Sequence, residues 1–369
     1  MASALLTTQP GWAFATLAEL RGRGVGERVE LHHRDSTLVL PAGALPREGL
    51  VTPAETCGVV AEGYARGGWD ATRALVDALW RTDVARAVGY WGRGDRGGRR
   101  PRTWTVVSEV WGETQVQRRQ LGEAVRQAMR AAFPRWREAA YEEAGQAEVR
   151  LVVKGDTRAA LAGVQLGTNL EAGGGGRPGA LRGHLACGLL AVAGLAPATK
   201  RMEGRTVVDP FAGSGTILEM AARHFGASAV MGAEVERGAV RLARQRLRPL
   251  AERGVAAEVL GGSFEEVAER VPEGAYLVSN LPFGERFGQI ETEELLAFLD
   301  EVAPRAAGVA LLMAREQGSI VAERVGLRAK NVIILGQAAA IAYGVRQRIE
   351  SREDNDVRPR RRQAARRAT

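Results

Sequence analysis

Cysteine and long apolar runs are scarce in this sequence of 369 residues. Its two cysteines, Cys57 and Cys187, stand far apart and form neither a disulfide framework nor a zinc-ligand spacing, so no metal is expected. The longest uncharged apolar runs, 185–198 and 332–345, have about 14 residues each, fewer than the roughly 18 that a membrane helix requires. The first charged residue is Glu19, so the basic start of a secretory signal is missing. We therefore expect a cytoplasmic protein that does not enter a membrane.

Lysine is also scarce, because it accounts for only three of the 51 basic residues. The net charge of +8 is unevenly distributed: residues 1–200 carry 26 basic and 20 acidic side chains, residues 201–350 carry 18 and 20, and residues 351–369 carry 7 and 3. This distribution suits a polyanion that one part of the chain holds and another part modifies. An arginine-rich composition also accompanies a GC-rich genome, so the charge alone leaves nucleic-acid binding open.

The first half of the chain mixes short strands with helices, which is typical of small α+β domains. Two glycine-rich stretches, 92–102 and 170–181, interrupt this pattern and predict linkers or loops. The arginines of the first stretch leave contact with phosphate groups open as a further role. Between the two stretches, 103–112 and 147–167 have strand patterns and 114–136 has the pattern of an amphipathic helix.

From residue 205 onward, strands and helices alternate regularly, which predicts a mostly parallel, doubly wound α/β sheet. The last two apolar runs meet at Gly336 and predict an antiparallel hairpin on the edge of this sheet. Residues 351–369 have the composition of a disordered basic tail.

The most specific motif is TVVDPFAGSGTILEMA, residues 206–221. A buried strand ends at Asp209, and a glycine-rich turn and a helix follow. Ligands bind parallel sheets at the carboxyl ends of the strands, and Gly213 and Gly215 allow the backbone to approach a ligand closely. The spacing matches neither the dinucleotide-binding motif nor the phosphate-binding P-loop. The candidate binding residues of this turn are Asp209, Pro210, Phe211, Ala212, Gly213, Ser214, Gly215 and Thr216.

An acid ends the next strand. Glu234 stands there, where a carboxylate can accept hydrogen bonds from both hydroxyl groups of a ribose. Glu236, two residues later, is expected to begin the following helix instead, because the helix dipole favours an acid at that end.

The fourth strand of this region is followed by NLPFG, residues 280–284. The side-chain oxygen of Asn280 and a main-chain carbonyl, that of Leu281, can accept the two N–H groups of an exocyclic amine, which orients the nitrogen and stabilises the positive charge that develops on it. Pro282 stiffens the turn, and Phe283 offers a face on which an extruded base can stack. By itself Asn-x-Pro is an ordinary turn; the glycine turn upstream makes it a candidate catalytic site of Asn280, Leu281, Pro282 and Phe283.

DPFAGSGT resembles the first motif of class I S-adenosylmethionine methyltransferases, and NLPFG resembles the motif of those that methylate planar nitrogen. The resemblance implies S-adenosyl-L-methionine as cofactor, with Asp209 at its methionine amino group, Glu234 at its ribose and Asn280 bordering it. The family usually has an acid after the third strand. This sequence has Ser263 there, whose hydroxyl can accept the same hydrogen bond from adenine, and Phe264 can pack on the adenine ring.

Over nearly its full length, the chain is similar to the THUMP-domain RNA methyltransferases. TQPGWAFATLAELRGRG resembles the opening of their ferredoxin-like unit, and RPGALRGHLACGLL resembles their linker helix. The resemblance implies an α/β protein with a Rossmann-like, doubly wound class I methyltransferase domain that follows α+β ferredoxin-like and THUMP domains. The implied parts are a ferredoxin-like domain over 1–95, a THUMP RNA-binding domain over 100–168, a linker and linker helix over 169–200, the methyltransferase domain over 201–350, and the tail over 351–369.

Leu-Pro-Phe-Gly is similar to the enzymes of this group that methylate guanosine N2 in the tRNA acceptor stem. This implies a tRNA guanine-N2 methyltransferase, which we expect to be a monomer that holds no metal. The following Gly-Glu-Arg is similar to relatives that act on large-subunit ribosomal RNA, so an rRNA guanine-N2 methyltransferase is an alternative. DNA or protein amines also stay open, because the planar-nitrogen motif also serves adenine N6 and glutamine. An alternative of another class is an RNA-binding protein without methyl transfer, which the departures at Ser263 and Leu281 would mark.

Overall fold

The chain forms two compact units. The first comprises Met1–Thr7, Glu27–His33 and Thr37–Thr168, and the second comprises Thr8–Gly26, Arg34–Ser36 and Asn169–Thr369. The computed structural model describes residues 3–25, 29–32, 37–46, 49–65, 70–91, 103–110, 118–147, 149–155, 159–169, 180–283, 290–334 and 336–346. The predicted tail, the first predicted linker and nearly all of the second lie outside the described residues.

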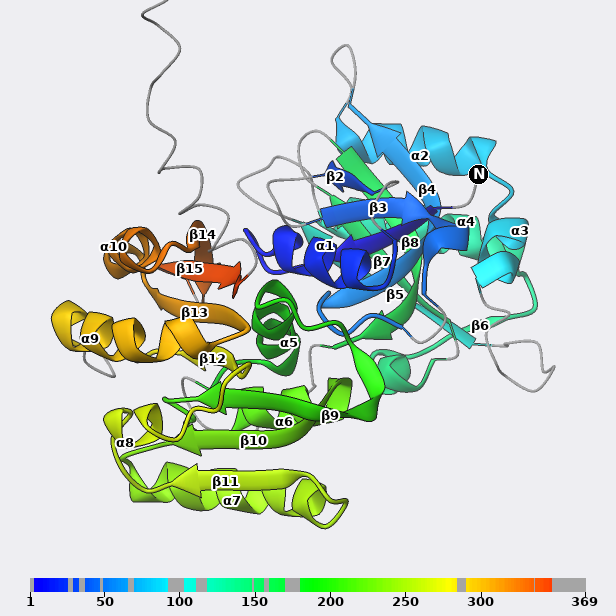
Figure 1. Ribbon diagram of the computed structural model, residues 1–369. Coiled ribbons are helices and arrows are strands. Elements are labelled where there is room, and N and C mark those ends of the chain that lie inside the picture. The colour runs from blue at the N-terminus through cyan, green and yellow to red at the C-terminus, as the bar shows by residue number, and fades with distance from the viewer. Residues whose placement is uncertain are drawn as a thin grey trace, which may run out of the picture. The chain divides into compact units, whose positions relative to one another are not determined.

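An eight-stranded sheet forms the first unit, in the order β2-β3-β1-β4-β8-β7-β5-β6 (Figure 1). Strand β5 is parallel to β6 and β7, and the other pairs are antiparallel. Because β4 pairs with β8, strands from 1–95 and from 100–168 share this sheet; their assignment to ferredoxin-like and THUMP domains stays a prediction. The strands are Ser3–Thr7 (β1), Glu30–His32 (β2), Thr37–Pro41 (β3), Glu55–Tyr64 (β4), Thr103–Val110 (β5), Arg137–Glu138 (β6), Val149–Gly155 (β7) and Ala159–Thr168 (β8).

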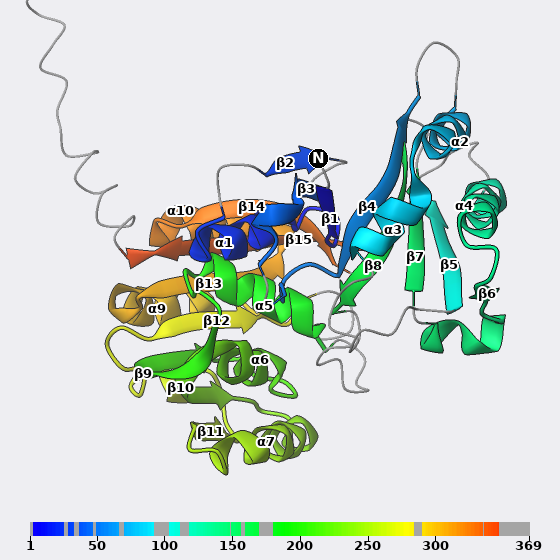
Figure 2. The ribbon, with the colours of Figure 1, turned by 90° about the vertical axis from the view of Figure 1, so that its right-hand side faces the viewer.

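Helices α2 (Ala71–Arg81), α3 (Val84–Trp91) and α4 (Arg118–Ala132) lie along one face of this sheet (Figure 2). Helix α2 begins after Asp70, whose side chain accepts a hydrogen bond from the N–H of Arg73 at 2.7 Å, as expected of an N-cap. Each helix turns apolar residues toward the sheet. The core between them includes Leu75, Leu79, Val88, Trp104, Leu121, Val125, Met129, Leu151 and Val153.

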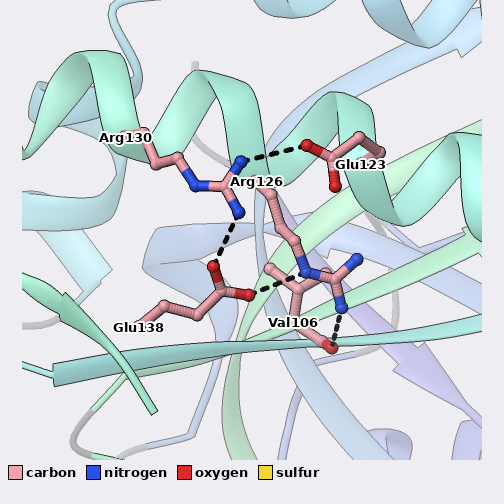
Figure 3. Close-up of polar contacts among 5 residues, drawn as sticks. All are labelled: Val106, Glu123, Arg126, Arg130 and Glu138. Atoms are coloured by element: carbon pink, nitrogen blue, oxygen red, sulfur yellow. Dashed lines mark hydrogen bonds and ion pairs between the residues drawn. The ribbon is translucent and has the colours of Figure 1, made fainter. Parts of the chain in front are cut away.

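Two arginines of α4 are held by acids. Figure 3 shows that Glu138 accepts hydrogen bonds from Arg126 at 2.7 Å and from Arg130 at 3.0 Å. Arg130 also donates to Glu123 at 3.0 Å, and Arg126 donates to the carbonyl of Val106 at 3.4 Å. Ion pairs near the surface contribute little to stability, so the network mainly fixes where these two positive charges lie.

The second unit contains a seven-stranded sheet in the order β11-β10-β9-β12-β13-β15-β14. The strands from β11 to β13 are parallel to one another, and β15 pairs antiparallel with both β13 and β14. This confirms the predicted doubly wound sheet with an antiparallel edge hairpin, which turns at Gly336. The strands are Ala198–Asp209 (β9), Phe225–Ala233 (β10), Ala256–Leu260 (β11), Tyr276–Asn280 (β12), Gly308–Ala314 (β13), Arg328–Ile334 (β14) and Gln337–Val345 (β15).

Helices cover both faces of the second sheet (Figure 1). The loops and helices that follow β11, β12 and β13 bury Val267, Leu295, Phe298 and Val321 against one face. The chain runs from β9 out to β11 and then back to β12 and β13, so right-handed crossovers place the helices between β9 and β11 on the other face. The helices are Gly183–Val192 (α5), Thr216–His224 (α6), Arg237–Ala251 (α7), Glu265–Ala268 (α8), Thr292–Val302 (α9) and Arg315–Val325 (α10).

Helix α1 (Ala13–Gly22) belongs to the second unit, although the sequence places it in the predicted ferredoxin-like domain. It packs against α5, where a Cβ on Gly188 would lie only 3.1 Å from the ring of Trp12. The ring of Phe14 lies 5.3 Å from that of Tyr343 in β15. An early segment of the chain therefore completes the core of the second sheet.

Candidate active site

The carboxyl ends of β9 and β12 lie side by side in the middle of the second sheet. These strands are parallel, with Val207 opposite Tyr276 and Val208 opposite Leu277. After β9 the chain continues outward to β10 and β11, and it then returns to β12 on the other side of β9. Ligands of open α/β sheets bind at such a reversal of strand order, and both predicted motifs begin there.

Asp209 is the last residue of β9, with only 1% of its surface exposed. Its Oδ1 accepts hydrogen bonds from the hydroxyl of Ser279 at 2.6 Å and from the N–H of Phe211 at 3.1 Å. Burial raises the pKa of Asp209 from 3.8 to about 7 despite these two hydrogen bonds, and the charge of Glu234 adds to the rise. A cation that reached this carboxylate would stabilise its charged form. Because Ser279 precedes Asn280, the hydrogen bond joins the two motifs directly.

The two glycines of the first turn have left-handed backbone conformations, with φ of +51° at Gly213 and +80° at Gly215, which favour glycine. Their surroundings differ. A Cβ on Gly215 would lie 3.2 Å from the Cβ of Ala243 in α7, whereas no described atom lies within 4 Å of a Cβ on Gly213. Gly215 thus allows the turn to pack on α7, and Gly213 borders open space.

Two residues that shape this turn were missed in the sequence. A Cβ on Gly232 would lie 2.8 Å from that of Ala212, whose N–H donates to the carbonyl of Ala233 at 2.9 Å. Arg246 of α7 donates to Oγ1 of Thr216 at 2.6 Å and so secures the first turn of α6. The available signal was Gly232 itself, since a glycine within a strand pattern indicates a close backbone approach.

Glu234 follows β10 directly and is half-buried. Its N–H donates to the carbonyl of Leu260 at 3.1 Å, which places it beside the end of β11, and its Oε1 accepts the N–H of Glu236 at 2.8 Å. Glu236 begins α7, as predicted, and accepts the N–H of Gly238 at 3.1 Å. Glu234 therefore presents an oriented, partly accessible carboxylate at the same edge as Asp209.

Phe264 connects the loop after β11 with the first turn. Its ring centroid lies 5.0 Å from that of Phe211 and 5.3 Å from that of Phe298 in α9. Ser263 is half-buried, and its N–H donates to Glu266 at 3.3 Å. The structure thus brings the predicted aromatic residue after β11 against the predicted turn after β9.

Asn280 ends β12, and its Oδ1 is buried without a hydrogen-bond partner among the described residues. Such an atom costs roughly 1–3 kcal/mol, which a hydrogen-bond donor on a ligand would offset. Leu281 is 1% exposed, and its N–H donates to the carbonyl of Leu312 at 2.9 Å, so the backbone is fixed where the motif begins. Pro282 and Phe283 are half-buried. The Oδ1 of Asn280 can therefore accept an N–H group from a ligand.

Within the described part of the chain, His, Cys, Asp and Glu residues do not gather in a group of three or more that could hold a metal ion. None of the helices described there has both the length and the apolar character needed to span a bilayer.

Comparison with known proteins relates this site to methyltransferases. Residues 175–333 match the family described as "RMKL-like, methyltransferase domain". No curated protein sequence matches the chain. The crystal structure of TrmN from Thermus thermophilus has a TM-score of 0.63 at 22% identity, over 93% of this chain and 99% of that chain.

Two further crystal structures have similar coverage. SMU.472, complexed with SAH, has a TM-score of 0.62 at 13% identity, over 93% of this chain and 97% of that chain. A predicted N6-adenine-specific DNA methylase from Listeria monocytogenes has a TM-score of 0.55 at 15% identity, over 93% of this chain and 96% of that chain. The structural likeness confirms the Rossmann-like fold, and the match over residues 175–333 indicates a methyltransferase domain similar to that of the RMKL-like family.

Proposed function

We propose that this protein is an S-adenosylmethionine-dependent RNA methyltransferase that modifies the exocyclic N2 of a guanosine in the tRNA acceptor stem. The observation that carries the proposal is the buried Oδ1 of Asn280, which accepts no hydrogen bond from the described residues. It lies at the reversal of strand order, one residue from Ser279, which is hydrogen-bonded to Asp209. None of the described residues donates a hydrogen bond to this oxygen, so the N–H of an exocyclic amine could supply the donor.

The residues around the end of β9 fit the proposed cofactor. The buried carboxylate of Asp209 suits its amino group, the open side of Gly213 gives it room, and the oriented carboxylate of Glu234 suits its ribose hydroxyls. Ser263 and Phe264, in the loop after β11, would hold the adenine. When bound, the cofactor supplies a methyl group on a positively charged sulfur.

Asn280 and Leu281 act on the substrate amine. The Oδ1 of Asn280 and the carbonyl of Leu281 accept its two N–H groups, direct the nitrogen lone pair and stabilise the positive charge that develops on it. Asn280 has no basic atom for the proton, so the proton leaves to water. Pro282 keeps the turn rigid, and Phe283 stacks on the extruded base, a contact worth about 1–3 kcal/mol.

RNA as the substrate is supported by the excess of positive charge in residues 1–200, and tRNA by the similarity of Leu-Pro-Phe-Gly to the tRNA guanine-N2 enzymes. Guanine N2 in ribosomal RNA is the alternative within the same reaction. Adenine N6 is a second candidate, because the same pair of acceptors suits that amine. The structurally similar protein from Listeria monocytogenes is described as a predicted N6-adenine-specific DNA methylase.

The full chain incubated with isotopically labelled S-adenosylmethionine and total RNA tests this proposal. We expect labelled N2-methylguanosine in the tRNA fraction, identified after nuclease digestion. Asn280→Ala should abolish labelling while it leaves RNA affinity nearly unchanged, and Asn331→Ala, which alters an exposed asparagine of β14, should retain full labelling. Label in ribosomal RNA, or in N6-methyladenosine, would show that one of the alternatives is the substrate and not guanosine N2 of tRNA. RNA binding without label, and without cofactor binding, would support the alternative of an RNA-binding protein.

A further inference from the structure

Ser279 is a polar residue in an apolar strand, YLVSN, and it is fully buried. A buried hydroxyl requires a partner, and the partner of Ser279 is Oδ1 of Asp209 on the neighbouring strand, at 2.6 Å. This is a hydrogen bond to an acid that lies 70 residues earlier in the sequence. Neither the glycine turn nor the NLPFG motif includes the serine.

We propose that Ser279 is a positioning residue that fixes the Asp209 carboxylate for the amino group of the cofactor, an inference that rests on the proposed function. Oδ1 of Asp209 accepts from both Ser279 and the N–H of Phe211. No described residue donates a hydrogen bond to Oδ2 of Asp209. The two donors hold the plane of the carboxylate, so the second oxygen is left to face a ligand.

The same hydrogen bond couples the two halves of the site. Ser279 and Asn280 are consecutive, and Asn280 ends the strand. A fixed Ser279 therefore holds the end of β12 against the end of β9. Loss of the hydroxyl should disturb the cofactor site first, because Asp209 loses one of its two donors, and the amine site second, through the backbone.

The electrostatic surroundings of Asp209 give this role a distinct signature. Burial and the carboxylate of Glu234, at the end of β10, favour the protonated form, whereas Ser279 and the N–H of Phe211 favour the ionised form. Without the serine hydroxyl, Asp209 should ionise at a higher pH. Because only the ionised form attracts an ammonium group, the pH at which the cofactor begins to bind tightly should rise as well.

Calorimetric titration with SAH, which binds without reacting, tests the inference between about pH 5.5 and pH 8. Ser279→Ala should bind SAH about 10-fold more weakly at neutral pH, as expected for a lost hydrogen bond to a charged group, and its binding midpoint should lie at higher pH than that of the native protein. Ser279→Cys, which keeps the size and a weak donor, should fall between them. Ser228→Ala is the matched control, because Ser228 donates to a backbone carbonyl elsewhere in the same sheet.

The amino group of SAH titrates equally with every variant, so differences between variants report on the protein. Unchanged SAH binding by Ser279→Ala, or weakening that is equal at every pH, would show that the serine is only structural and would overturn the inference. Failure of the native protein itself to bind SAH would instead contradict the proposed function. If Ser279→Ala does not fold, Ser279→Cys provides the same comparison.

Discussion

A Cβ atom on Gly215 would lie 3.2 Å from the Cβ of Ala243, because the turn after β9 packs directly against α7. Gly215→Ala would add this crowding to the strain of a backbone with φ of +80°. We therefore expect the free energy of unfolding to fall by about 1–3 kcal/mol. Urea denaturation followed by circular dichroism measures this change.

Gly213→Ala is the matched comparison, since it also places Ala at positive φ but meets no described atom within 4 Å. It should cost less stability than Gly215→Ala and should weaken SAH binding more strongly, because its methyl group occupies the space assigned to the ligand. Equal losses of stability in the two variants, with SAH affinity retained by Gly213→Ala, would show that the turn has no ligand beside Gly213.

Asp209 makes stability depend on pH. Its pKa is about 7 in the folded protein, against an ordinary value of 3.8, because burial disfavours its charge. Between these values the folded state holds a proton that the unfolded state has released. The contribution of Asp209 to the free energy of unfolding is therefore complete below about pH 4 and is lost as the pH rises toward 7. Asp209→Asn should remove this loss and flatten the profile of unfolding free energy over that range.

Asp300, whose pKa is lowered where that of Asp209 is raised, provides a control for this experiment. Arg324 donates to Asp300 at 2.7 Å and lowers the pKa of that exposed carboxyl. Asp300 therefore makes a small contribution to stability above its ordinary pKa, and this contribution is lost as the pH falls. Asp300→Asn should therefore leave the decline between pH 4 and pH 7 intact. A decline that persists in Asp209→Asn would mean that another group causes it.

The second sheet could be predicted because short stretches of the sequence indicate each of its strands and helices. Each buried parallel strand is a short apolar run that ends in a turn, and helices of suitable length alternate with the strands. Helix α1 could be predicted as a helix, but not as part of the second unit. Its burial depends on contacts such as that between Phe14 and Tyr343, which are more than 300 residues apart in the sequence and leave no local pattern.

The site also contains residues that short motifs predict and residues whose roles depend on distant contacts. Asp209 and Asn280 are recognisable from the short motifs around them, and their meeting follows from the order of parallel strands. Ser279 was not recognisable, because its role appears only when β12 pairs with β9 and brings its hydroxyl to Asp209. Likewise, the different tasks of Gly213 and Gly215 depend on the position of α7, which the sequence of the turn does not contain.

The arginines of α4 provide a test of RNA binding by the first unit. Arg118 and Arg119 are exposed and have no acidic partner among the described residues. Arg126 and Arg130, on the same helix, are paired with Glu138. The helix thus offers two positive charges that can meet phosphate groups freely and two that are already engaged.

Arg118→Ala combined with Arg119→Ala should weaken tRNA binding and lower the slope of log affinity against log salt concentration by about 1–2, because each phosphate contact releases about one counterion. Arg126→Ala combined with Arg130→Ala removes the same net charge and should change the slope less. Filter binding at several salt concentrations measures both double variants at equal charge. If they lose affinity and slope equally, tRNA is attracted by the overall charge of the unit, and neither arginine at the start of α4 contacts a phosphate.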